Sequence, residues 1–399
     1  MPLLSLFLEV LVLSESARAQ SADEPLAQTA PHSPVAKDHG LAVDAAENVY
    51  VAAYSTNRAF RVAPDGTLTP LIDATGDGDG NPLQAPMGIA VDADGNVYVS
   101  GGYSHNVFKI TSEGGISQIL DALGDGRGRS MVEPTALAVD AEGNVYVAAH
   151  GSDNAFRIAR NGTATQIIDH TGDRRGNGLR GPQGIAVDND GNVYVTGDSD
   201  NAFRITPQGA ITQILDATGD GEHPLRGAFG VTVDHEGTVF VTGHRSHNAF
   251  AIRDPGGERS VRQIIDASGD GDRHPLTGPL GIAVDASGNA YVAGRSSNNA
   301  FKITPEGAIT EIIDASGAGG EHPLDGAVGI AVGASGTVYL TEMGNDDVFR
   351  IPVVRILPGP GWIAILSPVV LLAFAGIAQL QKHRRAARQG LRATVVLLS

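Results

Sequence analysis

Hydrophobic positions recur along most of the chain in short runs, which are separated by turn-forming residues. Within residues 88–126 the runs are Ile89–Val91, Val97–Val99, Val107–Ile110 and Ile116–Leu120. Val, Ile, Tyr and Phe dominate such runs, and these residue types favour strands. The pattern therefore predicts four short β-strands in this segment.

The residues between the runs predict tight antiparallel connections. Asp94-Gly95-Asn96 separates the first run from the second, and glycine at such a position allows a positive φ. The third and fourth runs are separated in other segments by Pro64–Gly66 or Pro305–Gly307. Proline presets the turn and glycine closes it. Each segment is therefore expected to fold as one four-stranded antiparallel sheet.

This four-run unit occurs seven times, with anchor residues spaced by 48, 48, 48, 46, 51 and 48 positions. Short strands repeated at such a period are typical of a β-propeller, in which neighbouring units bury each other's faces. The prediction is an all-β, seven-bladed propeller. The anchor residues, which open the first run of each unit, are Gly40, Gly88, Ala136, Gly184, Gly230, Gly281 and Gly329.

Two aromatic columns support packing of unit against unit. Each unit contributes one ring from its second run and one from its third, so both columns are expected in the core between blades. The second-run column is Tyr50, Tyr98, Tyr146, Tyr194, Phe240, Tyr291 and Tyr339. The third-run column is Phe60, Phe108, Phe156, Phe203, Phe250, Phe301 and Phe349.

The unit GIAVDxxGNVYV followed by N-x-F-[RK]-[IV] resembles the NHL repeat class of β-propellers over residues 40–351. The resemblance implies the fold. It does not imply one function, because propellers of this class include lyases, protein and RNA binders and surface proteins.

The seventh unit departs from the pattern, because Ile351–Leu357 contains no turn. Either 353–357 forms a degenerate outer strand or the last blade has three strands. A six-bladed ring with a decayed seventh unit is the alternative. The expected propeller domain is 39–357, preceded by a linker over 20–38.

The two ends of the chain predict export and anchoring. Residues 2–13 are mostly apolar and precede Ala17-Arg18-Ala19, so 1–19 is expected to be a signal peptide. Residues 362–380 carry no charge and are long enough to span a bilayer. Basic residues follow within 381–399, which predicts a cytoplasmic tail and a propeller outside.

The Pro/Gly motif at 357–361, followed by this span and the basic cluster, resembles the PEP-CTERM class of sorting signals. Such tails are processed during surface display. The chain has Pro-Gly-Pro where that class has Pro-Glu-Pro, so a plain single-span anchor stays an open alternative. Residues 358–380 are therefore expected to form the Pro/Gly motif and a membrane helix, which would anchor the protein in the cell envelope.

Composition narrows the function. The net charge of −17 argues against nucleic-acid binding, because phosphates need Lys and Arg. The absence of cysteine excludes disulfide scaffolds, zinc fingers and thiol nucleophiles. Aspartate recurs with glycine in the loops between units, a pattern that suits Ca²⁺ but also suits simple turns. The candidate Ca²⁺ ligands are Asp77, Asp79, Asp220, Asp270 and Asp272.

Alternating strand direction places the second-to-third-strand loops and the loops between units on one face, where binding residues are expected. The ligand-face candidates are His105, His150, His247, His223, His274 and His322. The expected function is an interaction scaffold that binds a protein or glycan through this acidic, loop-rich face.

The alternative is a propeller lyase or hydrolase with a divalent metal at the central channel, similar to streptogramin lyases or amidating lyases. His39-Gly40 resembles the His-Gly element of amidating-lyase propellers. The histidine ring of that family is absent, however, and no catalytic residue is assigned. The residues at the equivalent positions are Met87, Thr135, Gln183, Phe229, Leu280 and Val328.

Overall fold

The computed structural model describes residues 38–254, 259–318, 322–344 and 348–352. These residues form seven antiparallel sheets and two one-turn 3-10 helices, η1 (Tyr54–Thr56) and η2 (His150–Ser152). The strands of blades 1 to 4 are β1 (Asp38–Val43), β2 (Val49–Ala53), β3 (Arg58–Val62), β4 (Leu68–Ile72), β5 (Pro86–Val91), β6 (Val97–Gly101), β7 (Asn106–Ile110), β8 (Ile116–Leu120), β9 (Pro134–Val139), β10 (Val145–Ala149), β11 (Asn154–Ile158), β12 (Ala164–Ile168), β13 (Pro182–Val187), β14 (Val193–Gly197), β15 (Asn201–Ile205) and β16 (Ile211–Leu215). The strands of blades 5 to 7 are β17 (Ala228–Val233), β18 (Val239–Gly243), β19 (Asn248–Arg253), β20 (Ser260–Ile265), β21 (Pro279–Val284), β22 (Ala290–Gly294), β23 (Asn299–Ile303), β24 (Ile309–Ile313), β25 (Ala327–Val332), β26 (Val338–Glu342) and β27 (Val348–Ile351).

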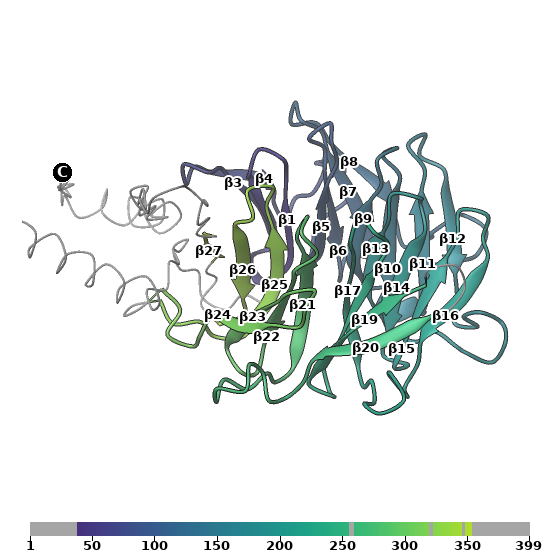
Figure 1. Cartoon of the computed structure of the whole chain (residues 1–399). Helices are drawn as coiled ribbons and strands as arrows, with labels where there is room; N and C mark the ends of the chain where they lie inside the picture. The colour runs from purple at the N-terminus through teal and green to yellow at the C-terminus, as the bar shows by residue number, and fades with distance from the viewer. Residues whose placement is uncertain (1–37, 255–258, 319–321, 345–347, 353–399) are drawn as a thin grey trace, which may run out of the picture.

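The sheets are the blades of a closed propeller. Within each sheet the strands are paired in chain order, so one sequence unit makes one blade. The innermost strands contact one another around the ring, from β1 to β5 and onward to β25, and β25 returns to β1. Figure 1 shows blade 7 beside blade 1 at this meeting point. The seven-bladed prediction is confirmed and the six-bladed alternative is wrong.

The hairpin between the first and second strands is fixed by one aspartate in most blades. In blade 2, Asp92 Oδ1 accepts hydrogen bonds from the backbone N–H groups of Asp94 and Asn96. Its Oδ2 accepts from the Tyr98 hydroxyl at 2.9 Å. The turn glycine, Gly95, has a φ of +78°. One side chain thus ties the turn to the aromatic column, and the face that carries these hairpins is called the turn face below.

The core lies between blades, as the aromatic columns predict. The cluster between blades 1 and 2 joins Tyr50 and Ile72 from blade 1 to Ile89 and Phe108 from blade 2. Every ring of the two columns is buried except Phe60, which is half-buried. Each blade thus covers the next, and no single unit could bury both of its faces alone.

The junction of blades 7 and 1 differs from the other six. Blade 7 has three strands among the described residues, and 353–357 lies outside them. Gly333 occupies the position of the turn aspartate, so Tyr339 lacks that partner in its own blade. Glu47 of blade 1 replaces it, accepting from the Tyr339 hydroxyl at 2.9 Å and from the Ser335 N–H at 2.8 Å. Burial and this carboxylate raise the pKa of Tyr339 to about 12. A side chain from the first blade therefore completes the last one.

The expected signal peptide, the membrane span with its tail, and the expected linker over 20–38 except for Asp38 all lie outside the described residues. Asp38 begins β1. Among the residues that the structure describes, no helix has the length and apolarity needed to cross a bilayer. The predictions for both ends of the chain stay predictions.

Candidate functional site

The loops on the face opposite the turn face converge around the ring axis, and their inner edge is called the channel mouth below. The loops between blades contact the second-to-third-strand loops there, for example through the Gly102 N–H, which donates to the Ala85 carbonyl at 2.9 Å. The prediction that the loops between blades and the second-to-third-strand loops lie on one face is thus confirmed. The mouth opens on an axial cavity of about 450 Å³ to which all seven anchor residues contribute.

The residues at the mouth are chemically diverse although the repeat is otherwise regular. The position directly after the second strand carries six different residue types in the seven blades, and only histidine occurs twice. Positions needed by every blade for folding should repeat, whereas a site for one ligand needs asymmetry. The mouth is therefore the strongest candidate site. From blade 1 to blade 7 these residues are Tyr54, Gly102, His150, Asp198, His244, Arg295 and Met343.

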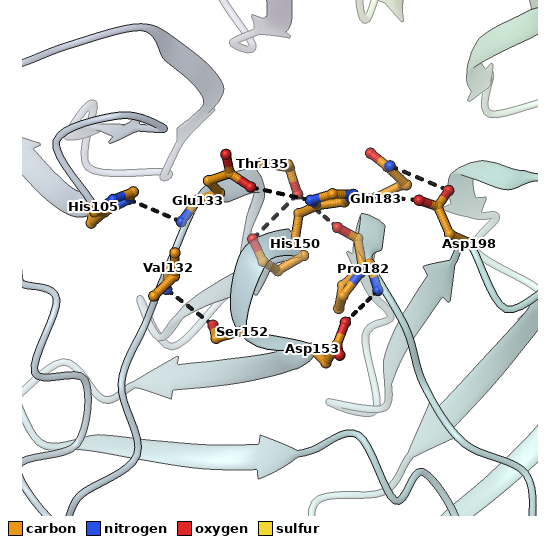
Figure 2. A network of polar contacts seen from close by, with 12 residues as sticks. His105, Val132, Glu133, Thr135, His150, Ser152, Asp153, Pro182, Gln183 and Asp198 are labelled. Carbon is orange, nitrogen blue, oxygen red and sulfur yellow. Dashed lines mark hydrogen bonds and ion pairs between the residues drawn. The ribbon is translucent and has the colours of Figure 1, made fainter.

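The central feature of the mouth is a histidine between two carboxylates. His150 begins η2 of blade 3, and its Nδ1 lies 3.3 Å from Glu133 Oε2. Its Nε2 lies 3.3 Å from Asp198 Oδ2 of blade 4. Gln183 Nε2 donates to the other Asp198 oxygen at 3.4 Å. Figure 2 shows the imidazole ring lying between the two acids, with the Gln183 amide beside Asp198. Glu133, His150 and Gln183 all line the axial cavity.

The carboxylates make this histidine a stronger base than a free imidazole. The hydrogen bond to Asp198 is the main cause that raises the pKa of His150, burial opposes it, and Glu133 adds to it. Reciprocally, the contact with His150 lowers the pKa of Asp198. Because the His150 side chain keeps 37% of its surface exposed, it can reach both a ligand and solvent. Such a group can take and return a proton near neutral pH.

Glu133 is held in a costly backbone conformation. Its φ is +51°, in the left-handed region, and four other blades have glycine at this position. The His105 ring holds it there, because His105 Nδ1 accepts from the Glu133 N–H at 3.1 Å. A non-glycine residue in this region costs about 1–3 kcal/mol. Observed strain of this kind is typical of functional positions, and here it aims a carboxylate at His150.

Two tyrosines flank this centre on the side of blades 1 and 2. The rings of Tyr54 and Tyr103 are 5.7 Å apart in an edge-to-face arrangement. Tyr103 lines the cavity and yet is 57% exposed, which is unusual for a large aromatic residue. An exposed ring beside a cavity offers a surface on which a ligand can stack.

Two of the predicted ligand-face histidines have structural roles. His105 caps the backbone of Glu133 as described, and His247 Nδ1 accepts from the Gly278 N–H at 2.9 Å. In other blades Asn57, Asp153 and Asp200 make the same contact with the next blade. The contact therefore belongs to the repeat.

The other candidate histidines lie at the outer rim. His223 Nδ1 contacts Asp220 at 3.0 Å, and Asp220 also accepts from the backbone of outer strand β20. His274 Nδ1 lies 2.8 Å from Asp270 and 3.6 Å from Glu311 of outer strand β24. His322 is half-buried in the corresponding loop of blade 7. Of the six predicted histidines, the structure brings His150 into the mouth.

The candidate Ca²⁺ ligands cap their own turns. Asp77 accepts from the Asp79 N–H at 3.0 Å, and Asp270 accepts from the Asp272 N–H at 2.9 Å. Burial would raise the pKa of Asp220, but hydrogen bonds from His223 and Glu222 lower it to about 2. Within the described ranges no three His, Asp or Glu side chains are placed to hold a metal ion. Hydrogen bonds within the turns account for these aspartates, and the loop Ca²⁺ and the divalent metal at the channel stay predictions.

The sequence interpretation missed Glu133 and Asp198. A signal for both was present in the aligned units, since Glu133 replaces a glycine and Asp198 shares a variable position with His150. Their convergence could not be predicted, because it depends on contacts across the junction of blades 3 and 4.

Comparisons with known proteins agree on the fold. A family model described as a beta-propeller repeat matches residues 181–204 and 271–302. No curated protein sequence gives a significant match. The chain is a repeat β-propeller.

Solved structures with a similar fold include two lyases. Virginiamycin B lyase from Staphylococcus aureus is 16% identical with a TM-score of 0.62, over 79% of this chain and 95% of that one. A streptogramin B lyase is 14% identical with a TM-score of 0.63, over 81% and 96%. A catalytically inactive His-to-Ala variant of the Staphylococcus aureus enzyme with Quinupristin is 16% identical with a TM-score of 0.63, over 82% of this chain and 99% of that one. At these identities the similarity shows the fold.

Proposed function

We propose that the protein is a propeller enzyme of the lyase type, in which His150 transfers a proton at the channel mouth. The observation that carries the proposal is the convergence of Glu133 and Asp198 on the two nitrogens of His150. The left-handed backbone at Glu133 supports it, because the equivalent positions carry glycine or, at Ala85, a small side chain, whereas Glu133 carries a carboxylate that contacts His150. The lyases among the similar solved structures are consistent with this chemistry on this fold.

The proposed reaction is an elimination. Neutral His150 donates its one N–H to one of the two carboxylates, and its other nitrogen leaves the second carboxylate and removes a proton from a carbon beside a carbonyl group. The C–H electron pair becomes a carbon–carbon double bond as the bond to the leaving group breaks. The resulting imidazolium is stabilised by Glu133 and Asp198, and it returns its proton to the leaving group. General acid–base catalysis of this kind contributes about 10²–10⁴-fold to a rate.

The test is turnover of a panel of activated esters and of quinupristin, the compound named with one similar lyase. Product masses identify the reaction, since elimination adds nothing to the atoms of the substrate whereas hydrolysis adds a water. We expect His150→Ala to lower kcat/KM by about 10²–10⁴-fold. His274→Ala is the matched control, because it removes another acid-paired histidine from the outer rim. Equal turnover by wild type and His150→Ala contradicts the proposal.

A second candidate function is the binding of a protein or glycan by the acidic loop face. The net charge of −17 and the exposed loop carboxylates support this candidate. It predicts a ligand whose affinity depends on loop aspartates such as Asp79 and Asp272 and not on His150. Isothermal titration of both variant sets against one ligand separates the two functions.

We also propose that the protein belongs to the NHL class of propellers and is exported and anchored through 362–380. The apolar leader, the uncharged span and the basic residues behind it support this topology. Cell fractionation with protease protection tests it. Exposure of the propeller to added protease in intact cells is the expected result.

A further inference from the structure

The half of the channel mouth opposite His150 has a different chemical character. In blades 5 and 6 the residues after the second strand are His244 and Arg295, and Arg245 follows His244. These positions are the repeat equivalents of His150 and Asp198. The mouth thus carries its two central acids on blades 3 and 4 and its cations on blades 5 and 6.

The two arginines lack acidic partners. Across the described part of the chain, neither Arg245 nor Arg295 has a carboxylate oxygen within 4.0 Å, whereas Arg226 beside them contacts Asp200. Arg295 Nε donates to Met343 Sδ at 2.9 Å, and a thioether is a weak acceptor. Arg245 is near enough to Asp198 to help lower the pKa of that carboxyl, but neither guanidinium group is neutralised by an ion pair. In a chain with a net charge of −17, two arginines without an ion pair beside one histidine are unusual.

His244 supplies a second, independent observation. Its Nδ1 is buried and has no hydrogen-bond partner among the residues described. Its ring lies 6.4 Å from Phe229, which lines the cavity. Burial lowers the pKa of His244, the Gly278 backbone opposes this effect, and the nearby Arg295 lowers the pKa further. A buried polar atom without a partner costs free energy, which is unusual for a structural position.

We propose that the substrate handled by His150 carries an oxyanion, such as a carboxylate, which binds to Arg245 and Arg295 beside His244. This inference rests on the proposed function, since it names the substrate class of the same mouth. A guanidinium group presents two parallel N–H donors that match a carboxylate. The protein as a whole repels anions, so a local cation pair is needed to hold one. Binding the anion on blades 5 and 6 leaves the rest of the substrate over the cavity, toward His150.

The test uses benzoate as the probe and benzamide as its neutral counterpart. Benzoate binding to the whole protein, followed by NMR of the histidine ring signals, should perturb His244, and benzamide should not. The double variant Arg245→Ala with Arg295→Ala should weaken benzoate binding by at least about tenfold, since charge-assisted hydrogen bonds are lost. Arg253→Ala is the control, because Arg253 pairs with Glu236 near the turn face. Lysine at both positions should restore part of the affinity.

The outcomes separate this inference from the proposed function. Benzoate binding that survives in the double-alanine variant overturns the inference. His150-dependent turnover with an unchanged KM for anionic substrates in that variant also overturns it, while the proposed function stands. Arginine-dependent benzoate binding without turnover of any substrate supports the inference and contradicts the proposed function.

Discussion

The two faces of the disc are built from the same repeat and differ in how far that repeat is kept. On the turn face, Asp92 and its equivalents make the same contacts in blade after blade, and Tyr98 and its equivalents follow them. At the channel mouth the residues after the second strand are of six different types in the seven blades. The strands that join the two faces are nearly identical.

This difference indicates which face carries stability and which carries function. Turn-face contacts close hairpins and satisfy buried hydroxyl groups, a task that every blade shares. At the mouth, Glu133 stands where most other blades have glycine, and its side chain contacts His150. Substitutions on the turn face should therefore change stability without changing turnover, and substitutions at the mouth should do the reverse.

The largest effect on stability is expected for Asp188→Ala on the turn face. Asp188 accepts from two backbone N–H groups, from Asn192 Nδ2 and from the Tyr194 hydroxyl. Its removal leaves three half-buried donors unpaired, so the free energy of unfolding should fall by about 2–4 kcal/mol. Urea unfolding measures this change. The control is Asp190→Ala, which removes an exposed carboxylate from the same turn. Equal stability of the two variants would contradict the assignment.

The junction of blades 7 and 1 gives the next effect. Glu47→Ala removes the acceptor for the Tyr339 hydroxyl and the Ser335 N–H. We expect the free energy of unfolding to fall by about 1–2 kcal/mol. Backbone amide hydrogen exchange should rise first in β25 to β27, because the junction of blades 7 and 1 joins the last blade to the first and closes the ring. Glu142→Ala, an exposed position in the corresponding turn of blade 3, is the control. Uniform exchange throughout all blades would refute a special role for Glu47.

At the mouth we expect one substitution to stabilise the protein while lowering its turnover. Glu133→Gly relieves the left-handed backbone and should raise the free energy of unfolding by about 1 kcal/mol. The same change removes a carboxylate from His150 and should lower turnover. Glu133→Gln separates the two effects, because it keeps the strain and loses the charge. A Glu133→Gly variant that is less stable than wild type would show that the strain argument is wrong.

The smallest effect concerns pH. The pKa of folded His150 is raised above its ordinary 6.5, so its ion pairs contribute stability below pH 6.5 and lose it as pH rises through the raised value. Solvent screening limits this contribution to about 0.2–0.5 kcal/mol. Turnover should change in the opposite sense, rising as His150 loses its proton. NMR titration of His150 in wild type and Asp198→Asn measures the shift, which the variant should reduce.

The sequence predicted most of the fold. The seven anchor residues, the hairpin signals such as Asp94-Gly95-Asn96 and the two aromatic columns all lie where they were expected. These features depend on local turn chemistry and on a repeated hydrophobic pattern, both of which can be recognised in the amino-acid sequence. The sequence alone also singled out His150, though in the company of five histidines that lie elsewhere.

The candidate site was decided by tertiary structure. Glu133 and Asp198 reach His150 from different loops, 17 and 48 positions away. Glu47 reaches Tyr339 across 292 positions. The sequence by itself determined how each unit folds and how many units there are, because those properties follow from periodicity and local propensity. Which side chains contact one another was decided only by the closed ring. The repeat places equivalent residues at equivalent positions, and contacts across blade junctions then determine which of the differing side chains form a site.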